Sequence, residues 1–559
     1  MKQLKNAIES AVKDLFGVDT DPELVRSDEQ FGDFSCNIAM QIAVQIKKPP
    51  HEIASKLAQK INNKTFQVDV AGPGFLNITL GDDLLWQMAY NKPSQTLAGQ
   101  TIVAEYSDPN PFKPLHAGHL YTTFVGDAIA NLVEVAGAKV FCVNFGGDVG
   151  PHVARTIWAI IQELGGEKPD KLANITQPNA DARAKKLGEL YTSGNNAYED
   201  NKTAKQEITE LNKRIYQIHA DNDHDSPLAQ IYWQSRQWSY DYFDDFYKKI
   251  NTHFDKYYPE SLTAPIGLAT VQEQLKNGIY EASDGAIVFR GEKYNLHTRV
   301  FINSDGLPTY EAKDVGLILS KWNDYHPDMS IIITANEITE YMKVVMKSIE
   351  QYAPDLVKGT RHITHGLVKL QGGVKMSSRK GNVLLANDII EAADKEVSDK
   401  HNFQSESVKN DVTFGSIRYS FVKSRIGGDI IYDPKESVSL EGNSGPYLQY
   451  AHARARSILS KSDFQGRTLE TMTVGDGERS LLRKIGEFSE VVDKAVVELK
   501  PHHICTYLYE LAQIFNRFYE KNRVIGDKRE VMRVLLVKSY VDVLENGLKI
   551  LNIPTPEKL

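Results

Sequence analysis

Residues 101–145 decide the fold; they read TIVAEYSDPNPFKPLHAGHLYTTFVGDAIANLVEVAGAKVFCVNF. TIVAEYS at 101–107 predicts a strand, and a proline-rich turn covers 108–114. A helical pattern runs from about Ala117 to Val135, and KVFCVNF near residue 140 predicts the next strand. Strand, helix and strand in this order form a βαβ unit, which starts a parallel sheet.

The residues before this unit predict a small α+β domain. Apolar positions recur at helical spacing over 3–16 and 36–62, and FQVDV (66–70) and FLNITL (75–80) predict strands. We place this domain at 1–96, which is an ordinary size for a small domain.

The residues after the unit continue the alternation of strands and helices. Strands are predicted at RVFIN (299–303), IIITA (331–335) and HITHGLVKL (362–370), with a helix from Glu311 to Lys321. From about 160 to 260 the chain is helical and polar, which indicates an insertion or a solvated helical layer. We therefore predict an α/β domain over 97–440, built on a Rossmann-type parallel sheet with a helical insertion.

Beyond about residue 440 the strand signals end. Four amphipathic helical patterns follow, at 445–463, 478–499, 502–523 and 528–551. They predict an all-α domain over 441–559.

Composition excludes several classes of protein. The chain has 559 residues, with 65 Lys and Arg against 73 Asp and Glu, and a formal net charge of −8. Cys36, Cys142 and Cys505 lie far apart and form no CxxC pair, which argues against a disulfide framework or a cysteine zinc finger. No apolar run resembles a signal peptide or a membrane span, so we expect a cytoplasmic protein without a membrane partner. The acidic balance of the whole chain argues against a nucleic-acid partner.

The turn between the first strand and its helix is a candidate anion site. NPFKPLHAGHL (110–120) lies where the carboxyl end of a parallel strand meets a helix N-terminus, whose free N–H groups favour phosphate. His116 and His119 are one helical turn apart and project to the same side, and Gly118 leaves room for a flat ligand. Taken alone, the HxxH pair is equally compatible with chance, a helix cap or a metal site.

A second candidate is the loop VKMSSRKGN at 374–382, which follows the strand HITHGLVKL. Its three cations, two hydroxyls and flanking glycines describe a loop able to fold over a polyphosphate. A solvated basic loop is the alternative, and the segment alone favours it.

Together, HAGH and KMSSR resemble the HIGH and KMSKS signatures of class I aminoacyl-tRNA synthetases. The surrounding residues are similar to the arginyl-tRNA synthetase family: EYSDPNPFKPLHAGHL, VNFGGDVG at 143–150 and LPTYEAKDVG at 307–316. The resemblance extends to GDFSCNIAM and AGPGFLNI in the first domain, which implies a tRNA-binding domain at 1–96. It also covers SGPYLQYAHARARSI, which implies an anticodon-binding domain at 441–559.

The resemblance implies ATP-dependent attachment of L-arginine to tRNA(Arg) through arginyl-adenylate, with release of AMP and pyrophosphate. It implies Mg²⁺ bound with ATP, no metal held by the protein alone, and a monomer. The implied catalytic residues are His116, His119, Lys113, Lys375, Ser377 and Ser378. The implied ATP-binding residues are His116, Gly118, His119, Lys375, Met376 and Arg379.

One residue departs from the KMSKS pattern, because Ser378 stands where the signature has its second lysine. By resemblance, Lys113, just before HAGH, supplies the missing cation. Charge reasoning agrees that the site needs a compact cation near the phosphates. Lys380 is the competing candidate.

Arginine recognition calls for carboxylates, because a guanidinium presents a planar fork of five donors. The resemblance implies that Glu105 and Asp314 receive this fork, that Tyr310 packs on or bonds the side chain, and that Asn110 and His116 hold the amino and carboxylate end. Composition alone favours another role for Asp314, as a helix-surface acid that pairs with Lys313 or Lys321. The family gives no fixed role to Asn336 and Glu337.

The acidity of the chain is uneven. Residues 450–559 carry 18 Lys and Arg against 15 Asp and Glu, so this tail is mildly basic. Cations interleave with the aromatic residues Tyr450, Phe515 and Tyr519 at helical spacing, which suits a phosphate backbone and unpaired bases. The predicted tRNA-binding residues are Arg454, Arg456, Tyr447, Arg517 and Arg523. Each alone is equally typical of a solvated helix face.

Three alternatives were weighed. Another class I synthetase, or a HIGH-type nucleotidyltransferase, would share HAGH but not both terminal domains. A non-catalytic tRNA-binding paralogue would be expected to lose the histidines or the acidic pair, which are present here. A metalloenzyme lacks a nearby third ligand and an HExxH motif.

Overall fold

The computed structural model describes residues 1–371, 384–400, 403, 405–462 and 473–559. At its centre lies a five-stranded sheet in the order β12-β11-β5-β6-β7, and every pair in it is parallel. The strands are β5 (Thr101–Glu105), β6 (Lys139–Gly146), β7 (Lys256–Pro259), β11 (Met329–Ala335) and β12 (Thr360–His365). The predicted Rossmann-type parallel sheet is confirmed.

Helix α5 (Ala117–Val135) connects β5 to β6, as the βαβ pattern predicted. Apolar residues cover most of its circumference, and its side chains are buried along nearly the whole length. A helix that is apolar all round belongs in a core, which explains why it lies between the sheet and the C-terminal helices.

The N-terminal part folds as the predicted α+β unit. Its antiparallel sheet has the order β1-β2-β4-β3. The strands are β1 (Val25–Arg26), β2 (Phe34–Cys36), β3 (Phe66–Ala71) and β4 (Phe75–Leu80); the helices are α1 (Lys2–Phe16), α2 (Ile38–Ile46), α3 (Pro50–Ile61) and α4 (Asp82–Ala89), with a 3₁₀ turn, η1 (Glu29–Phe31). The helical pattern at 36–62 is interrupted, because Lys47 adopts a left-handed conformation (φ 54°) before two prolines.

Two predicted strands belong to other sheets. β10 (Arg299–Ile302) joins an antiparallel sheet with β8 (Glu281–Ser283) and β9 (Ala286–Phe289), so RVFIN does not extend the parallel sheet. HITHGLVKL divides into β12 and β13 (Val368–Leu370), and β13 pairs with β14 (Ile430–Tyr432). The division falls at Gly366, where a Cβ would lie 2.2 Å from the Gly428 oxygen, so the backbones approach too closely for a side chain.

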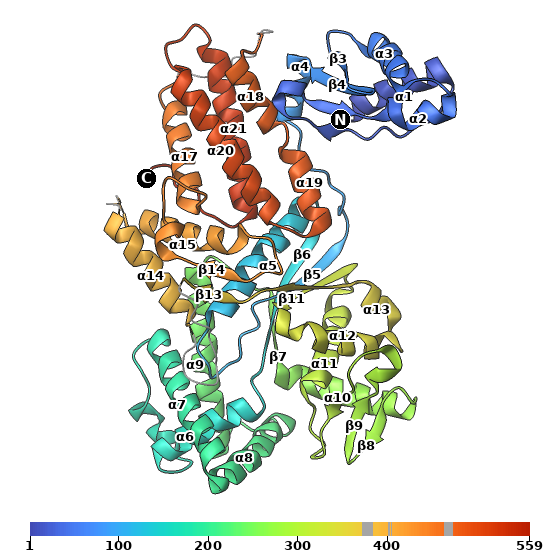
Figure 1. The fold of residues 1–559 in the computed structure, drawn as a ribbon. Coiled ribbons are helices and arrows are strands. Elements are labelled where there is room, and N and C mark those ends of the chain that lie inside the picture. Colours follow the sequence, from blue (N-terminus) through green and yellow to red (C-terminus); the bar gives the residue numbers. More distant parts are fainter. Residues whose placement is uncertain (372–383, 401–402, 404, 463–472) are drawn as a thin grey trace.

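The polar helical stretch predicted at about 160–260 is a group of helices with its own apolar core. It comprises α6 (Pro151–Leu164), η2 (Pro169–Asn174), α7 (Ala180–Asp200), α8 (Lys202–Ala220) and α9 (Pro227–Lys249), and it lies below the sheet in Figure 1. The last predicted residues instead form β7, which the sequence pattern missed. The other helical elements between residues 260 and 358 are α10 (Glu260–Lys276), α11 (Tyr310–Tyr325), α12 (Thr339–Glu350) and α13 (Pro354–Lys358), with the turns η3 (Gly291–Tyr294) and η4 (Asn336–Ile338).

The C-terminal part is all-helical, as predicted. α14 (Ala386–Lys400), α15 (Glu406–Val422) and α16 (Pro434–Ser437) lead to α17 (Gly445–Leu459), α18 (Asp476–Ile485), α19 (Phe488–Glu498), α20 (His502–Lys521) and α21 (Glu530–Ile550). The pattern at 478–499 is two helices rather than one, divided at 486–487. The N-terminal domain lies against α18 in Figure 1, where Arg479 donates to Asp33 (2.6 Å) and Asp82 (3.0 Å).

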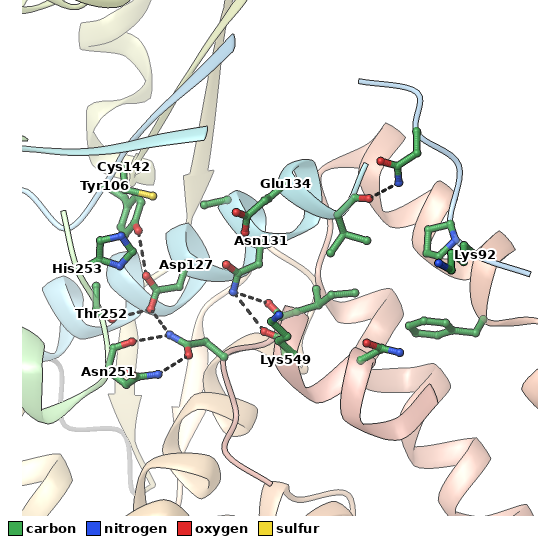
Figure 2. Close-up of a pocket in the computed structure, with 18 residues that line it drawn as sticks. Lys92, Tyr106, Asp127, Asn131, Glu134, Cys142, Asn251, Thr252, His253 and Lys549 are labelled. Atoms are coloured by element: carbon green, nitrogen blue, oxygen red, sulfur yellow. Dashed lines mark hydrogen bonds between the residues drawn. The ribbon is translucent and has the colours of Figure 1, made fainter. Parts of the chain in front are cut away.

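A buried polar network joins α5 to the C-terminal tail. Asp127 of α5 accepts hydrogen bonds from Tyr106 (3.0 Å), Thr252 (2.6 Å), Arg418 (2.8 Å) and Asn552 (3.2 Å). Figure 2 shows Asp127 between Tyr106 and Thr252. A cavity of about 630 Å³ lies beside it, and no residue predicted to bind ATP or arginine lines this cavity. Among the described helices, none is long and apolar enough to cross a membrane.

Candidate active site

The predicted site residues gather at the carboxyl edge of the parallel sheet. Glu105 is the last residue of β5 and His116 precedes α5. Glu260, which was not predicted, directly follows β7. Asp314 reaches the same place from α11, since its carboxylate interacts electrostatically with Glu105 and Glu260. Ligands of open α/β sheets bind at this edge, so fold and residues indicate the same site.

His116 and His119 cap helix α5 reciprocally. Nδ1 of His116 accepts from the backbone N–H groups of Gly118 (3.1 Å) and His119 (3.3 Å), and Nδ1 of His119 accepts from the His116 N–H (3.2 Å). The two rings stack with centroids 3.6 Å apart. The pair is therefore a helix cap, one of the alternatives that the sequence left open, and it also presents both rings on one side.

Burial keeps both rings neutral, and the capping hydrogen bonds decide which ring nitrogen carries the proton. Burial, with a smaller effect of Lys113, lowers the pKa of His116 to about 4, and burial lowers the pKa of His119 well below its usual range. Both rings are thus neutral at physiological pH. Because each Nδ1 accepts a hydrogen bond, each Nε2 carries the proton and is the nitrogen available to donate.

Gly118 lies directly against the first ring. A Cβ at this position would sit 2.9 Å from Cε1 of His116, so a side chain would push the capping histidine aside. A further contact ties this corner to residues 384–386: the Ala117 N–H donates to the Leu384 oxygen (2.9 Å), and the Ala386 N–H donates to the Leu115 oxygen (3.0 Å).

Lys375, Met376, Ser377, Ser378 and Arg379, predicted to act on ATP, lie outside the described residues, as does Lys380. Leu385, which comes later in the chain, forms a β-bridge with His116.

Lys113 lies close enough to the histidines to act on both electrostatically. Its Nζ is 4.5 Å from the ring centre of Tyr191, and its charge lowers the pKa of His116 and His119. Among the described residues Lys113 has no ion-pair partner, so its charge is available to an anionic ligand.

The acids form a cluster around one buried lysine. Glu105 is buried and pairs with Lys321, which is fully buried. Asp314 accepts a hydrogen bond from the Tyr341 hydroxyl, and burial, with the nearby Glu105 and Glu260, raises its pKa to about 8. Burial and Glu105 also raise the pKa of Asp108, which accepts from the Phe145 N–H (2.9 Å).

The ion pairs of the cluster exclude the alternative role for Asp314 and add a partner to Glu105. Asp314 is not a surface acid paired with Lys313 or Lys321, because Lys313 pairs with Glu260 and Lys321 with Glu105. Glu105 does not present a free carboxylate, because Lys321 already occupies one of its oxygens. A guanidinium at this place would share Glu105 with a lysine.

The remaining predicted arginine-binding residues border this cluster. Asn110 accepts from the Gly147 N–H through Oδ1 (2.9 Å). Tyr310 is 55% exposed and lies at the opening, 5.2 Å from Nζ of Lys313. His152 bonds the Gly147 oxygen (2.6 Å) through Nε2 and packs behind Asn110.

Sequence reasoning missed several residues of the site. They are Asp108, His152, Glu260, Lys313 and Tyr341. Lys313 lies inside the motif LPTYEAKDVG, and His152 lies two residues after VNFGGDVG, so both are close to residues that the motifs indicated. Glu260 and Tyr341 come from segments without a recognisable pattern, and only the fold brings them in.

The predicted tRNA contacts divide into available and occupied side chains. Arg517 and Arg523 are exposed, and Arg454 lies 4.8 Å from the ring centre of Tyr450, on a face shared by α17 and α20. Arg456 is held by a two-bond contact with Glu557 (2.9 and 2.6 Å), so its charge is largely compensated. Phe515 is buried and stacks on Tyr540, which contradicts its proposed role in base stacking.

The Rossmann-type sheet, the histidine-capped helix and the helical C-terminal part agree with the resemblance to class I aminoacyl-tRNA synthetases. A family model described as "tRNA synthetases class I (R), catalytic domain" matches residues 82–433. The model "Arginyl tRNA synthetase N terminal domain" matches 2–80, and "DALR anticodon binding domain" matches 448–559. The chain belongs to the arginyl-tRNA synthetase family.

Relatives named arginine–tRNA ligase match along nearly the whole chain. That of Flavobacterium psychrophilum is 28% identical and covers 92% of this chain and 90% of its own. That of Clostridium perfringens is 29% identical and covers 95% and 94%. The solved arginyl-tRNA synthetase of Thermus thermophilus shares the fold, with a TM-score of 0.79, 24% identity and complete coverage of both chains. The predicted family and enzyme class are confirmed.

Proposed function

We propose that the chain joins L-arginine to tRNA(Arg) in two steps at the carboxyl edge of its parallel sheet. In the first step the arginine carboxylate attacks the α-phosphate of ATP, which forms arginyl-adenylate and releases pyrophosphate. In the second, the 2′-hydroxyl of the terminal adenosine takes the arginyl group and AMP leaves. The observation that carries the proposal is the stacked, neutral histidine pair next to the acidic cluster at the end of β5.

The first step needs no base, because a carboxylate is already a nucleophile. Catalysis then depends on position and on charge stabilisation at the phosphoryl oxygens. The Nε2–H groups of His116 and His119 would donate to these oxygens, and the dipole of α5 places its positive end toward them. Gly118 would let the adenine approach the backbone.

The cations would balance the charge of the leaving pyrophosphate. Lys113 is the proposed substitute for the missing signature lysine, with Lys375, Ser377 and Ser378 closing over the phosphates, and Met376 and Arg379 contacting ATP. Mg²⁺ would be bound through the phosphates of ATP. In the described part of the chain no group of three His, Cys, Asp or Glu side chains is placed to hold a metal.

Arginine would be recognised through its charge and its shape. Asp314 would accept two hydrogen bonds from the guanidinium, while Glu105 offers the oxygen that Lys321 does not occupy. Asn110 and His116 would hold the amino and carboxylate end. Tyr310, exposed at the opening, would pack over the bound side chain.

tRNA would contact the helical domain at the face of α17 and α20. Arg454, Arg517, Arg523 and Tyr447 are the candidates that the structure leaves accessible or half-buried. Domain boundaries near 96 and 440, a monomer and a cytoplasmic location remain predictions.

The decisive experiment is ATP–pyrophosphate exchange across the twenty amino acids, with and without tRNA(Arg). We expect exchange with arginine only. Exchange with another amino acid, or none with arginine in the presence of tRNA(Arg), would overturn the proposal.

A further inference from the structure

Tyr341 contacts Asp314, the residue proposed to bind the guanidinium, and no sequence motif indicated this contact. It lies in the first turn of α12, which follows β11 and η4 at the carboxyl edge of the sheet. Its hydroxyl donates to Oδ2 of Asp314 on the adjacent helix α11. The contact therefore links the helix after β11 to the residue expected to receive the substrate.

The surroundings of Tyr341 hold its ring in place. The ring packs against the apolar cluster beneath β11, and the Arg299 guanidinium lies 5.1 Å from the ring centre. Arg299 is itself paired with Glu311 (3.1 Å). Because these contacts hold the ring of Tyr341 in one orientation, its hydroxyl group also has one direction. The hydrogen bond from this hydroxyl therefore favours one position of Oδ2 of Asp314.

We propose that Tyr341 is a positioning residue for arginine recognition, whose hydroxyl holds the Asp314 carboxylate in the orientation that receives the guanidinium. The inference rests on the proposed function and adds a residue to it. Tyr341 acts through Asp314, so its loss should weaken arginine binding and leave the phosphate chemistry at His116 unchanged.

The same bond bears on the charge of Asp314. Burial raises its pKa, and the Tyr341 hydrogen bond opposes that rise because it stabilises the carboxylate. The other charged groups facing Asp314 are Glu105 from β5, Asp108 from the following loop, Glu260 from α10 and Lys321 from α11. On the side of Tyr341 they are Glu311 and Arg299. None of these groups changes when the tyrosine hydroxyl is removed.

The test compares Tyr341→Phe with wild type in arginine-dependent ATP–pyrophosphate exchange by the full chain with tRNA(Arg), over a range of pH. A hydrogen bond to a charged group predicts a rise of about tenfold in the KM for arginine. kcat and the KM for ATP should change little. The acid limb of kcat/KM for arginine should move to higher pH, because Asp314 is then harder to ionise.

Tyr280→Phe is the matched control, since this tyrosine is buried in the same apolar cluster but its hydroxyl donates to Ser348 (3.1 Å). It should leave the KM and the acid limb unchanged. In a second variant, 3-fluorotyrosine at position 341 keeps the shape and strengthens the donor, and it should move the limb to lower pH.

The inference would be overturned if the acid limb of kcat/KM for arginine were unchanged in both Tyr341→Phe and the 3-fluorotyrosine protein. Equal rises in the KM for arginine and the KM for ATP in Tyr341→Phe would also overturn it. These results are distinct from failure of the proposed function, in which wild type itself shows no arginine-dependent exchange. If Tyr341→Phe does not fold, the position of the acid limb in the 3-fluorotyrosine protein tests the inference by itself.

Discussion

Replacement of Lys113 tests how this chain manages without the second lysine of the KMSKS signature. Lys113 lies beside the histidine pair, lowers the pKa of both rings and has no ion-pair partner among the described residues. In the free enzyme its charge is therefore not compensated by an ion pair with any described residue. We expect Lys113→Ala to slow adenylate formation strongly without unfolding the protein, since the side chain is only half-buried.

The magnitude follows from the position of this charge. A cation about 4 Å from a phosphate oxygen contributes about 4 kcal/mol at an effective dielectric constant of about 20. Hydrogen bonds to charged groups contribute a net of about 1.5–3 kcal/mol. At about 1.4 kcal/mol per factor of ten, the smaller range corresponds to a rate loss of about tenfold to a hundredfold.

The assay is single-turnover formation of arginyl-adenylate with saturating ATP, arginine and tRNA(Arg). Tyr191→Leu is the matched control: it keeps the lysine but removes the ring 4.5 Å from Nζ, a contact that contributes about 0.5–1 kcal/mol at exposed sites. It should cost about fivefold at most. A loss below about threefold for Lys113→Ala, or a larger loss for Lys380→Ala, would refute the assignment and favour Lys380.

Three further changes test other parts of the molecule. Asp314→Ala should raise the KM for arginine at least about tenfold, because a bound guanidinium would lose its acceptor; an unchanged KM contradicts the assignment. Asp314→Asn should unfold at a higher temperature than wild type at alkaline pH but not at acidic pH. The folded pKa of Asp314, about 8, lies above its ordinary value, so its contribution to stability is lost as pH rises through that range; parallel melting curves would contradict this. Arg418→Met should lower the free energy of unfolding by about 3–5 kcal/mol, measured with urea, because it leaves Asp127 buried without its cation. Adding Asp127→Asn should recover part of that loss, and full additivity of the two changes would argue against a direct pair.

The sequence predicted the parallel sheet well because one local pattern encodes it. The βαβ unit at 101–145 combines a strand, a turn and a helix in consecutive residues, and α5 begins and ends at the predicted residues. The misplaced strand at 299–303 shows the limit of such patterns. Its residues have the composition of a strand in either sheet, and pairing with β9 rather than β11 depends on contacts distant in the chain.

The same limit applies to the site. Residues inside the quoted motifs, such as Asn110 and His116, could be predicted because the motif states their position. The partner of Glu105 could not be predicted, because Lys321 lies more than two hundred residues away and only the packing of α11 against β5 joins them. Tyr341 was missed for the same reason, since its segment carries no motif and its role depends on a neighbouring helix.

The charges of the site explain why an acidic chain suits an arginine substrate. Glu105, Asp108, Asp314 and Glu260 gather at one edge, while Lys321 and Lys313 compensate two of them among the described residues. Burial raises the pKa of Asp108, Asp314 and Glu260, and that of Asp314 reaches about 8, so the Asp314 carboxyl of the empty site holds a proton at neutral pH. A bound arginine would bring a guanidinium and an ammonium group, and would displace this proton. Arginine binding should then release protons to the buffer, which calorimetry in buffers of different ionisation enthalpy measures directly. A site selective for charge alone would accept lysine equally well, so the proposed contact of the planar fork with Glu105 and Asp314 would have to supply the remaining selectivity.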